Sequence, residues 1–316
     1  MNALHLRSPF FYRTFLFIVL FELLSLFGYL LPQFNTAAFF LIVLIVAILT
    51  LWKLEYGCYL LLAELFIGSK GFLFFWAIGN TMISLRIALW LLVMSVWCAR
   101  FLTKKEERDF WRGMLKHSVF RWVFVFFFVI LFATAQGFLR NTASDAFFDM
   151  NGWLFFLLVF PFFSALRQRV HFDNVLSILF AATFALALKA LVILFIYSHD
   201  PLGGVFLPVY RWVRTTGVGE ITTIAPTFAR IFFQSQIYTL IAFFLLFVQK
   251  QKKISIQHSA FSIIFFSSII LSLSRSFWLA SIVTLCIALL SLRQWKKIVE
   301  ILAVGIAGFF LIVAVV

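Results

Sequence analysis

A set of arginines stands apart from the other charged residues, because each lies at the end of an apolar run or in a long polar segment. These residues are Arg86, Arg211, Arg214, Arg230 and Arg275. A guanidinium group presents a planar fork of N–H donors that matches phosphate oxygens in pairs. Several such forks would bind a diphosphate and neutralise its charge. We therefore predict that these arginines bind an anionic diphosphate.

Polar neighbours strengthen this prediction around two of the arginines. The stretch SLSRSFW, Ser272–Trp278, is a short polar break between two apolar runs and carries Arg275 between Ser274 and Ser276. Arg230 lies in APTFARIFFQSQ, where we expect a proline-bearing loop to enter a helix, and Gln234 follows it. The hydroxyl and amide groups would add hydrogen-bond donors. Helix starts after Pro226 and Ser84 would add backbone N–H groups.

The composition defines the elements that must position these side chains. Of 316 residues, 64% are hydrophobic and 12% charged, whereas soluble domains have about 45–50% apolar and roughly 25% charged residues. Apolar runs of about 18 or more residues indicate transmembrane helices. We therefore predict an all-α, polytopic transmembrane bundle, a single domain over residues 1–316, with about eleven spans.

The predicted spans follow the apolar runs. They cover approximately Phe15–Leu31, Ala37–Trp52, Gly57–Asn80, Ser84–Arg100, Val119–Gly137, Trp153–Leu166, Val175–Tyr197, Ile231–Val248, Phe261–Leu273, Phe277–Leu292 and Ile298–Val316. The third is interrupted at Gly68, Ser69 and Gly71, as a kink or re-entrant break would be. Residues 103–118 form a charged loop, and residues 198–230 a long, weakly hydrophobic segment.

The net charge of +14 is best explained by the positive-inside rule, which places Lys and Arg in cytoplasmic loops. With a cytoplasmic N-terminus, residues 103–118 and the basic runs 249–253 and 292–297 lie inside. The basic residues left for the outside or the spans are Lys70, Arg86, Arg140, Lys189, Arg211, Arg214, Arg230 and Arg275. Nucleic-acid binding is therefore not predicted. The alternative for each outer arginine is that it only snorkels to outer-leaflet phosphates.

Two acids and one base lie inside apolar runs: Glu22, Glu64 and Lys189. They form either a proton relay or polar contacts between helices. Lys189 would pair with Glu22 or Glu64. Asp145, Asp149 and Glu220 lie outside and could bind sugar hydroxyls or simply be solvated.

Four pieces of sequence, in this order, resemble the O-antigen ligase and O-antigen polymerase superfamily. They are ELFIGSKG (64–71), SLRIALWLLVMSVW (84–97), APTFARIFF (225–233) and SLSRSFWLASIVTLCIALL (272–290). The resemblance implies a GT-C-like membrane glycosyltransferase of the bacterial inner membrane, without metal or cofactor, that acts in polysaccharide and lipopolysaccharide biosynthesis of the cell envelope. It would move a glycan from undecaprenyl diphosphate to a hydroxyl of a glycan, lipid or protein on the periplasmic face.

The resemblance also implies roles for individual residues. Arg230 and Arg275 match the outer arginines that hold the diphosphate in this family, and Arg86 is a weaker match. The family carries an acceptor-activating histidine in a periplasmic loop after a helix like the last one here, so we expect that histidine and the last spans beyond Val316. The catalytic base is therefore not among these residues. The rival hypothesis is a transporter or flippase of a lipid-linked or anionic solute, with Glu22, Glu64 and Lys189 as its relay.

Overall fold

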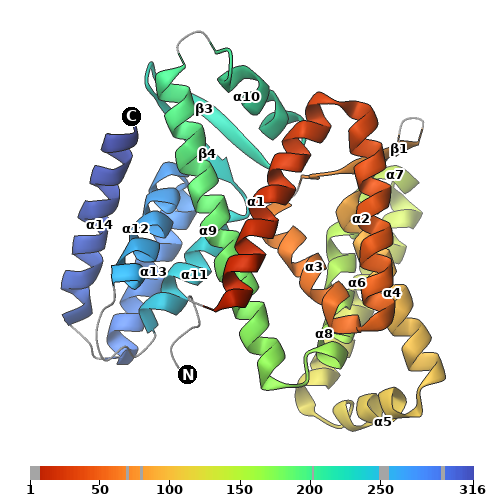
Figure 1. Cartoon of the computed structure of the whole chain (residues 1–316). Coiled ribbons are helices and arrows are strands. Elements are labelled where there is room, and N and C mark those ends of the chain that lie inside the picture. The colour runs from red at the N-terminus through yellow and green to blue at the C-terminus, as the bar shows by residue number, and fades with distance from the viewer. Residues whose placement is uncertain (1–7, 69–70, 79–80, 201–202, 249–255, 293–295) are drawn as a thin grey trace. The chain divides into compact units, whose positions relative to one another are not determined.

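The computed structural model describes residues 8–68, 71–78, 81–200, 203–248, 256–292 and 296–316. The chain is mostly helical, as predicted (Figure 1). Its helices are α1 (Pro9–Leu30), α2 (Pro32–Trp52), α3 (Leu54–Gly68), α4 (Leu85–Thr103), α5 (Lys105–Met114), α6 (Ser118–Arg140), α7 (Ala143–Leu154), η1 (Phe155–Leu158), α8 (Val159–Ala165), α9 (Arg169–His199), α10 (Phe206–Thr215), α11 (Gln236–Val248), α12 (Ile256–Leu271), α13 (Arg275–Leu292) and α14 (Lys296–Val315).

Among the described residues, five helices are long and apolar enough to cross a membrane: α1, α2, α4, α6 and α9. Shorter apolar helical stretches are Gly152–Ala165, Gln236–Leu246, Ile256–Leu271 and Ile301–Val315. The helix ends follow local chemistry. Ser8 caps α1 by accepting a hydrogen bond from the Phe11 amide, with Pro9 at the first helical position, where a proline has no amide to leave unpaired.

The chain divides into two compact units. The first unit comprises Met1–Ile42, Tyr59–Arg86 and Phe172–Val316, and the second comprises Val43–Cys58 and Ile87–His171. In the first unit α9 is the central helix, with 72% of its apolar window buried. It packs on α1 through Phe184 and Phe15, whose ring centroids are 5.4 Å apart, and on α12 through Phe184 and Phe261, at 4.3 Å.

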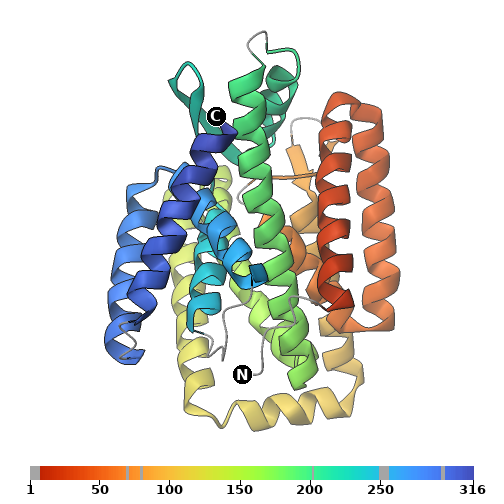
Figure 2. The ribbon, with the colours of Figure 1, turned by 60° about the vertical axis from the view of Figure 1, so that its left-hand side comes forward.

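Two antiparallel hairpins and a short helix gather at one end of the first unit, which we call the hairpin end (Figure 2). The hairpins are β1–β2 (Phe75–Ile78 and Thr81–Ser84) and β3–β4 (Gly219–Ala225 and Phe228–Phe233), and the helix is α10. The Phe72 amide donates to the Thr216 carbonyl at 2.9 Å, and the Tyr197 hydroxyl to the Ala225 carbonyl at 3.1 Å. These bonds tie β1 to α10 and β3 to α9.

Both hairpins correct the predicted spans. The prediction that the third span continues to Asn80 is wrong, because the helix ends at Gly68 and a hairpin follows. Packing explains the change, since a Cβ on Gly71 would collide with the backbone of Thr216 and Gly217. The prediction that Arg230 and Ile231 enter a helix is also wrong, because both lie on β4 and the helix begins at Gln236.

Two of the predicted polar segments contain regular structure. Residues 103–118 hold the amphipathic helix α5, and residues 198–230 hold α10, β3 and part of β4. Ser69, Lys70, Asn80, the run 249–253 and residues 293–295 lie outside the described residues.

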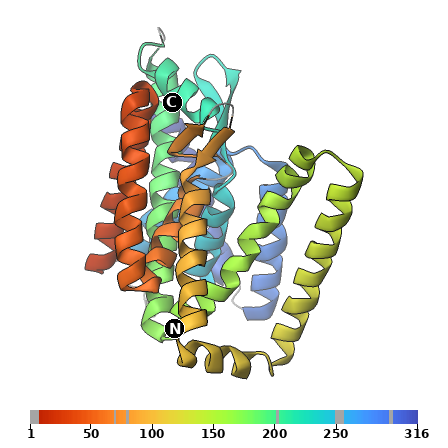
Figure 3. The same ribbon diagram turned by 90° about the vertical axis from the view of Figure 1, so that its right-hand side faces the viewer.

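Figure 3 shows the second unit, in which α5 connects α4 to α6, and α7, η1 and α8 run back along α6. Arg167 holds α8 to α5, because its guanidinium bonds the Glu107 carboxylate at 2.7 Å and lies 3.8 Å from the Phe110 ring centroid. In contrast to α9, α6 has 0% of its apolar window buried.

Candidate functional site

The turn between α12 and α13 is built from serine hydroxyls and one strained residue. The Ser272 hydroxyl donates to the Ile269 carbonyl at 2.6 Å and accepts from the Ser274 amide at 3.2 Å. Leu273 adopts φ 44°, a left-handed conformation that is uncommon for residues other than glycine. This geometry ends α12 and starts α13 at Arg275 within a few residues.

Arg230 contacts this same turn from β4. Its Nε donates to the Ser272 carbonyl oxygen at 2.8 Å, although the two residues are 42 positions apart. Alternation along β4 buries Ala229 and Ile231 and leaves Arg230 half-buried on the other face, next to Phe232, whose ring centroid lies 5.0 Å from the guanidinium carbon. The structure therefore brings Arg230 to the turn that carries Arg275, Ser274 and Ser276.

Arg275 is exposed, and the salt bridges found among the described residues do not include it. It begins α13, so Trp278 and Ile282 lie three and seven positions further along the same helix face. Both line an apolar groove of about 380 Å³ with Phe266 and Ile269 of α12. Arg275 thus stands at the polar end of an apolar groove.

Arg86 has a different environment from Arg275. Its Nε lies 2.7 Å from Glu64 Oε2 and its Nη2 lies 3.1 Å from Glu64 Oε1. The side chains are 11% and 3% exposed. This two-pronged ion pair joins the last turn of α3 to the first turn of α4. Helix α4 begins after Ser84, as predicted. However, the charge of Arg86 is neutralised by Glu64, one of the two acids found inside apolar runs.

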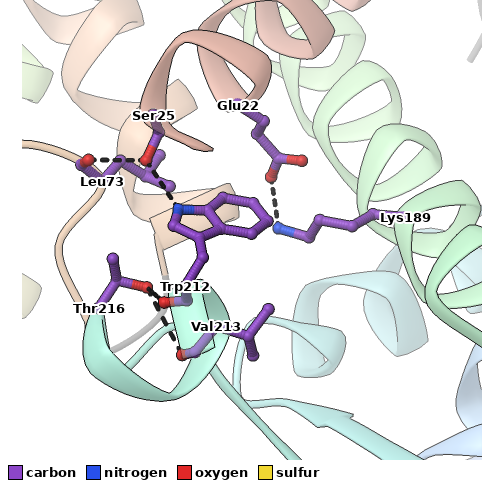
Figure 4. A network of polar contacts seen from close by, with 7 residues as sticks. All are labelled: Glu22, Ser25, Leu73, Lys189, Trp212, Val213 and Thr216. Atoms are coloured by element: carbon purple, nitrogen blue, oxygen red, sulfur yellow. Dashed lines mark hydrogen bonds and ion pairs between the residues drawn. The ribbon is translucent and has the colours of Figure 1, made fainter. Parts of the chain in front are cut away.

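Arg211 and Arg214 are exposed on α10, whose opposite face buries Val209, Trp212 and Val213. Trp212 is anchored by a network within the first unit (Figure 4). Its Nε1 donates to the Ser25 hydroxyl at 3.2 Å, and that hydroxyl donates to the Leu73 carbonyl at 2.7 Å. Both arginines therefore project from a helix that is fixed to α1 and to the segment before β1.

Lys189 and Glu22 form the second buried ion pair, with Nζ and Oε1 2.6 Å apart and both side chains 9% exposed. The prediction that Lys189 pairs with Glu22 or Glu64 is confirmed, with Glu22 as the partner. The ammonium also lies 4.7 Å from the Phe233 ring centroid and 5.7 Å from that of Trp212. Both acids of the predicted relay are thus held in contacts between helices.

Among the predicted supporting side chains, Gln234 is half-buried in the turn between β4 and α11. The more constrained amide is that of Gln236, which is 0% exposed. Its Nε2 donates to the Ser268 carbonyl at 3.0 Å, and its Oε1 accepts from the Phe233 amide at 3.0 Å. Gln236 thereby holds β4 against α12. The sequence offered both glutamines as polar neighbours of Arg230, and the contacts with Ser268 and Phe233 distinguish Gln236 from Gln234.

Asp200 organises the start of the α10 segment. Its half-buried side chain accepts hydrogen bonds from the Phe206 amide at 2.7 Å, the Val205 amide at 2.6 Å and the Gly204 amide at 3.3 Å. These backbone donors stabilise the ionised form and lower the pKa of Asp200 below its usual value.

Comparison with protein-family models, with curated proteins and with solved structures returned no match for this chain. What the fold defines is a mostly helical protein with several apolar helices that could span a membrane. Its hairpin end carries Arg211, Arg214, Arg230 and Arg275 without a carboxylate partner in the described residues, together with the paired Arg86.

Proposed function

We propose that this chain acts as an integral membrane glycosyltransferase of the O-antigen ligase or polymerase type. It would transfer a glycan from undecaprenyl diphosphate to a hydroxyl acceptor on the periplasmic side of the inner membrane, with its N-terminus in the cytoplasm. The observation that carries the proposal is the meeting of Arg230 with the turn that begins α13 at Arg275, at the end of an apolar groove.

This arrangement suits an amphiphilic diphosphate. A polyprenyl chain would lie along the groove between Trp278, Ile282 and Phe266, where packing against the apolar lining would supply van der Waals contacts. The diphosphate would then lie at the helix start, within reach of the guanidinium groups of Arg275 and Arg230. Ser276, exposed in the first turn of α13, and the α13 amides add donors there.

In the proposed reaction the arginines stabilise the leaving group. Transfer forms a bond between the acceptor oxygen and the anomeric carbon and breaks the bond between that carbon and the diphosphate oxygen. The proton of the acceptor hydroxyl passes to a general base, and negative charge develops on undecaprenyl diphosphate. Preorganised cations at that point lower the barrier more than they stabilise the ground state. Arg211 and Arg214 would bind the outer phosphate or glycan from α10. Arg86 would contribute mainly through structure, because Glu64 already neutralises it.

The test uses the complete protein in cells whose own copy is deleted. We expect Arg275→Ala and Arg230→Ala each to reduce glycan transfer by roughly a hundredfold, the effect of removing one donor to a developing anion. The amount of protein in the membrane should stay unchanged. Arg112→Ala is the matched control, because Arg112 is exposed on α5 and its ion pair among the described residues is with Asp109; transfer should stay normal.

The membrane leaflet in which unused lipid-linked glycan accumulates distinguishes the transferase hypothesis from the transporter hypothesis. If the chain is a transferase, the lipid-linked glycan accumulates in the outer leaflet of the deletion cells. Accumulation in the cytoplasmic leaflet would instead support the transporter hypothesis. Wild-type transfer by the Arg230→Ala, Arg275→Ala double variant would contradict the proposed role of the arginines.

A further inference from the structure

We propose that the cleft between α6 and α7 of the second unit binds a sugar ring. The cleft has a volume of about 300 Å³, at the lower limit of typical small-molecule sites, which span about 300–1,000 Å³. Its lining combines a carboxylate, an amide, a hydroxyl and an indole: Asp149, Asn141, Thr134 and Trp153. The proposal uses none of the arginines and holds for either function class.

Helix periodicity brings these side chains onto facing stripes. On α6, Phe126, Ile130, Thr134 and Gly137 follow each other at three- and four-residue intervals and all line the cleft. On α7, Ala146, Asp149, Met150 and Trp153 do the same. The helices approach closely where a Cβ on Gly137 would lie 3.8 Å from that of Ala146. The cleft is therefore a groove between the paired helices.

Asp149 lies on the wall of this groove, away from the start of α7, and can contact a polar occupant. Asp149 follows the first residue of α7 by six positions, which corresponds to about 9 Å along the helix. Thr134 precedes the last residue of α6 by the same interval, so the carboxylate and the hydroxyl lie at similar depth. Asp149 is exposed, and the ion pairs found in the described ranges do not involve it. Its ionised carboxylate can therefore accept hydrogen bonds from a polar ligand in the groove.

A hydroxyl-rich ring suits these groups better than a lipid chain does. The Asp149 oxygens accept hydrogen bonds from hydroxyls, and Thr134 can donate and accept. The Asn141 amide nitrogen donates to the Gly137 carbonyl at 3.2 Å, which orients the amide while its side-chain oxygen can still accept. Trp153 is 48% exposed and offers an aromatic face to the C–H face of a sugar. Phe126 and Met150 add apolar contact.

The test measures binding of a short alkyl glycoside to the complete protein, purified in a detergent without sugar. Native mass spectrometry compares octyl β-glucoside with octyl tetraethylene glycol ether, which has the same tail and no ring hydroxyls. We expect the glucoside to bind at least tenfold more tightly. Asp149→Asn should weaken glucoside binding roughly tenfold, as expected for loss of a charge-assisted hydrogen bond, and should not change binding of the ether.

Asp145→Asn is the matched control. Asp145 lies one turn earlier on α7, is exposed, and hydrogen-bonds Thr142 at 2.7 Å outside the cleft; its replacement should leave glucoside binding unchanged. Trp153→Leu should weaken binding of the glucoside but leave the thermal stability of the protein unchanged, because Trp153 is half-exposed. Equal binding of glucoside and ether, or an Asp149→Asn variant that binds glucoside normally, would overturn the proposal. Preferential binding of octylammonium would also overturn it, by assigning the groove to an amine.

Discussion

Arg86 and Arg275 have similar local positions in the first unit, because Arg86 is in the first turn of α4 and Arg275 is the first residue of α13. Glu64 binds Arg86 through two contacts in a buried pocket, whereas Arg275 is exposed at the end of an apolar groove. The comparison teaches that an arginine at the end of an apolar run does not by itself indicate a ligand site. A carboxylate on a neighbouring helix decides whether the charge serves the fold or can serve a ligand.

The sharpest way to test this difference is to remove the carboxylate. Glu64→Gln removes the carboxylate that neutralises the buried Arg86 charge and should lower the free energy of unfolding by about 3–5 kcal/mol. The measurement is reversible unfolding of the purified protein in mixed detergent. Arg275→Gln is the comparison variant and should change stability by no more than about 0.5 kcal/mol, as surface substitutions do. Equal losses in both variants would show that the two arginines do not differ in structural role.

A second test changes the space around the ion pair and leaves its charges intact. A Cβ at Gly68 would lie 2.5 Å from Glu64 Oε1 and 2.6 Å from Arg86 Nη2. Gly68→Ala should therefore cost about 1–3 kcal/mol, as overpacking does.

The control for this test is Gly113→Ala on α5. Apart from its chain neighbours and the backbone of its own helix, no heavy atom of the described residues would lie within 4 Å of the added Cβ. The substitution should therefore be neutral or stabilise by up to about 1 kcal/mol through helix propensity. A Gly68→Ala protein as stable as Gly113→Ala would mean that the Arg86–Glu64 pair can move aside freely.

The smallest expected effect concerns Asp200, whose charge is stabilised by backbone amides and not by an ion pair. Backbone amides lower the pKa of Asp200, so its ionised form stabilises the start of α10 at neutral pH. That contribution is complete above the ordinary aspartate value of about 4 and is lost as the pH falls through the lowered value in the folded protein. Thermal unfolding of the wild type and Asp200→Asn should differ at pH 7 and converge below the lowered pKa. A gap that persists in acid would contradict this role.

Local patterns in the sequence were sufficient for most of the helices. The predicted spans over Ala37–Trp52 and Val175–Tyr197 lie within α2 and α9, and the span Ser84–Arg100 lies within α4 except for its first residue. Long apolar runs without helix breakers have few alternatives. The same patterns failed at Phe75–Ile78 and at residues 231–233, where strands replaced predicted helix. Both segments are apolar and rich in β-branched or aromatic residues, so hydropathy alone could not distinguish a hairpin from a helix.

Partner identity was beyond the reach of local patterns. The acids inside the apolar runs were recognised as partners for buried cations, but the sequence left open which acid meets which base. Glu22 meets Lys189 across 167 positions, and Glu64 meets Arg86 across 22. Likewise, the sequence identified Arg230 and Arg275 as two outer arginines on different segments. The hydrogen bond from Arg230 to the Ser272 carbonyl shows that both lie at the turn between α12 and α13.

The sequence by itself determined that this chain is mostly helical, that several helices are apolar enough to span a membrane, and which charged residues break that pattern. The tertiary structure decided which of those charged residues form buried ion pairs and which stay exposed. The physical reason is that apolarity and periodicity act over one or two helical turns, whereas a charge is satisfied by whichever neighbouring helix presents the opposite charge at the same depth. Arg86 and Arg275 have the same chemistry in the sequence, and only packing distinguishes them.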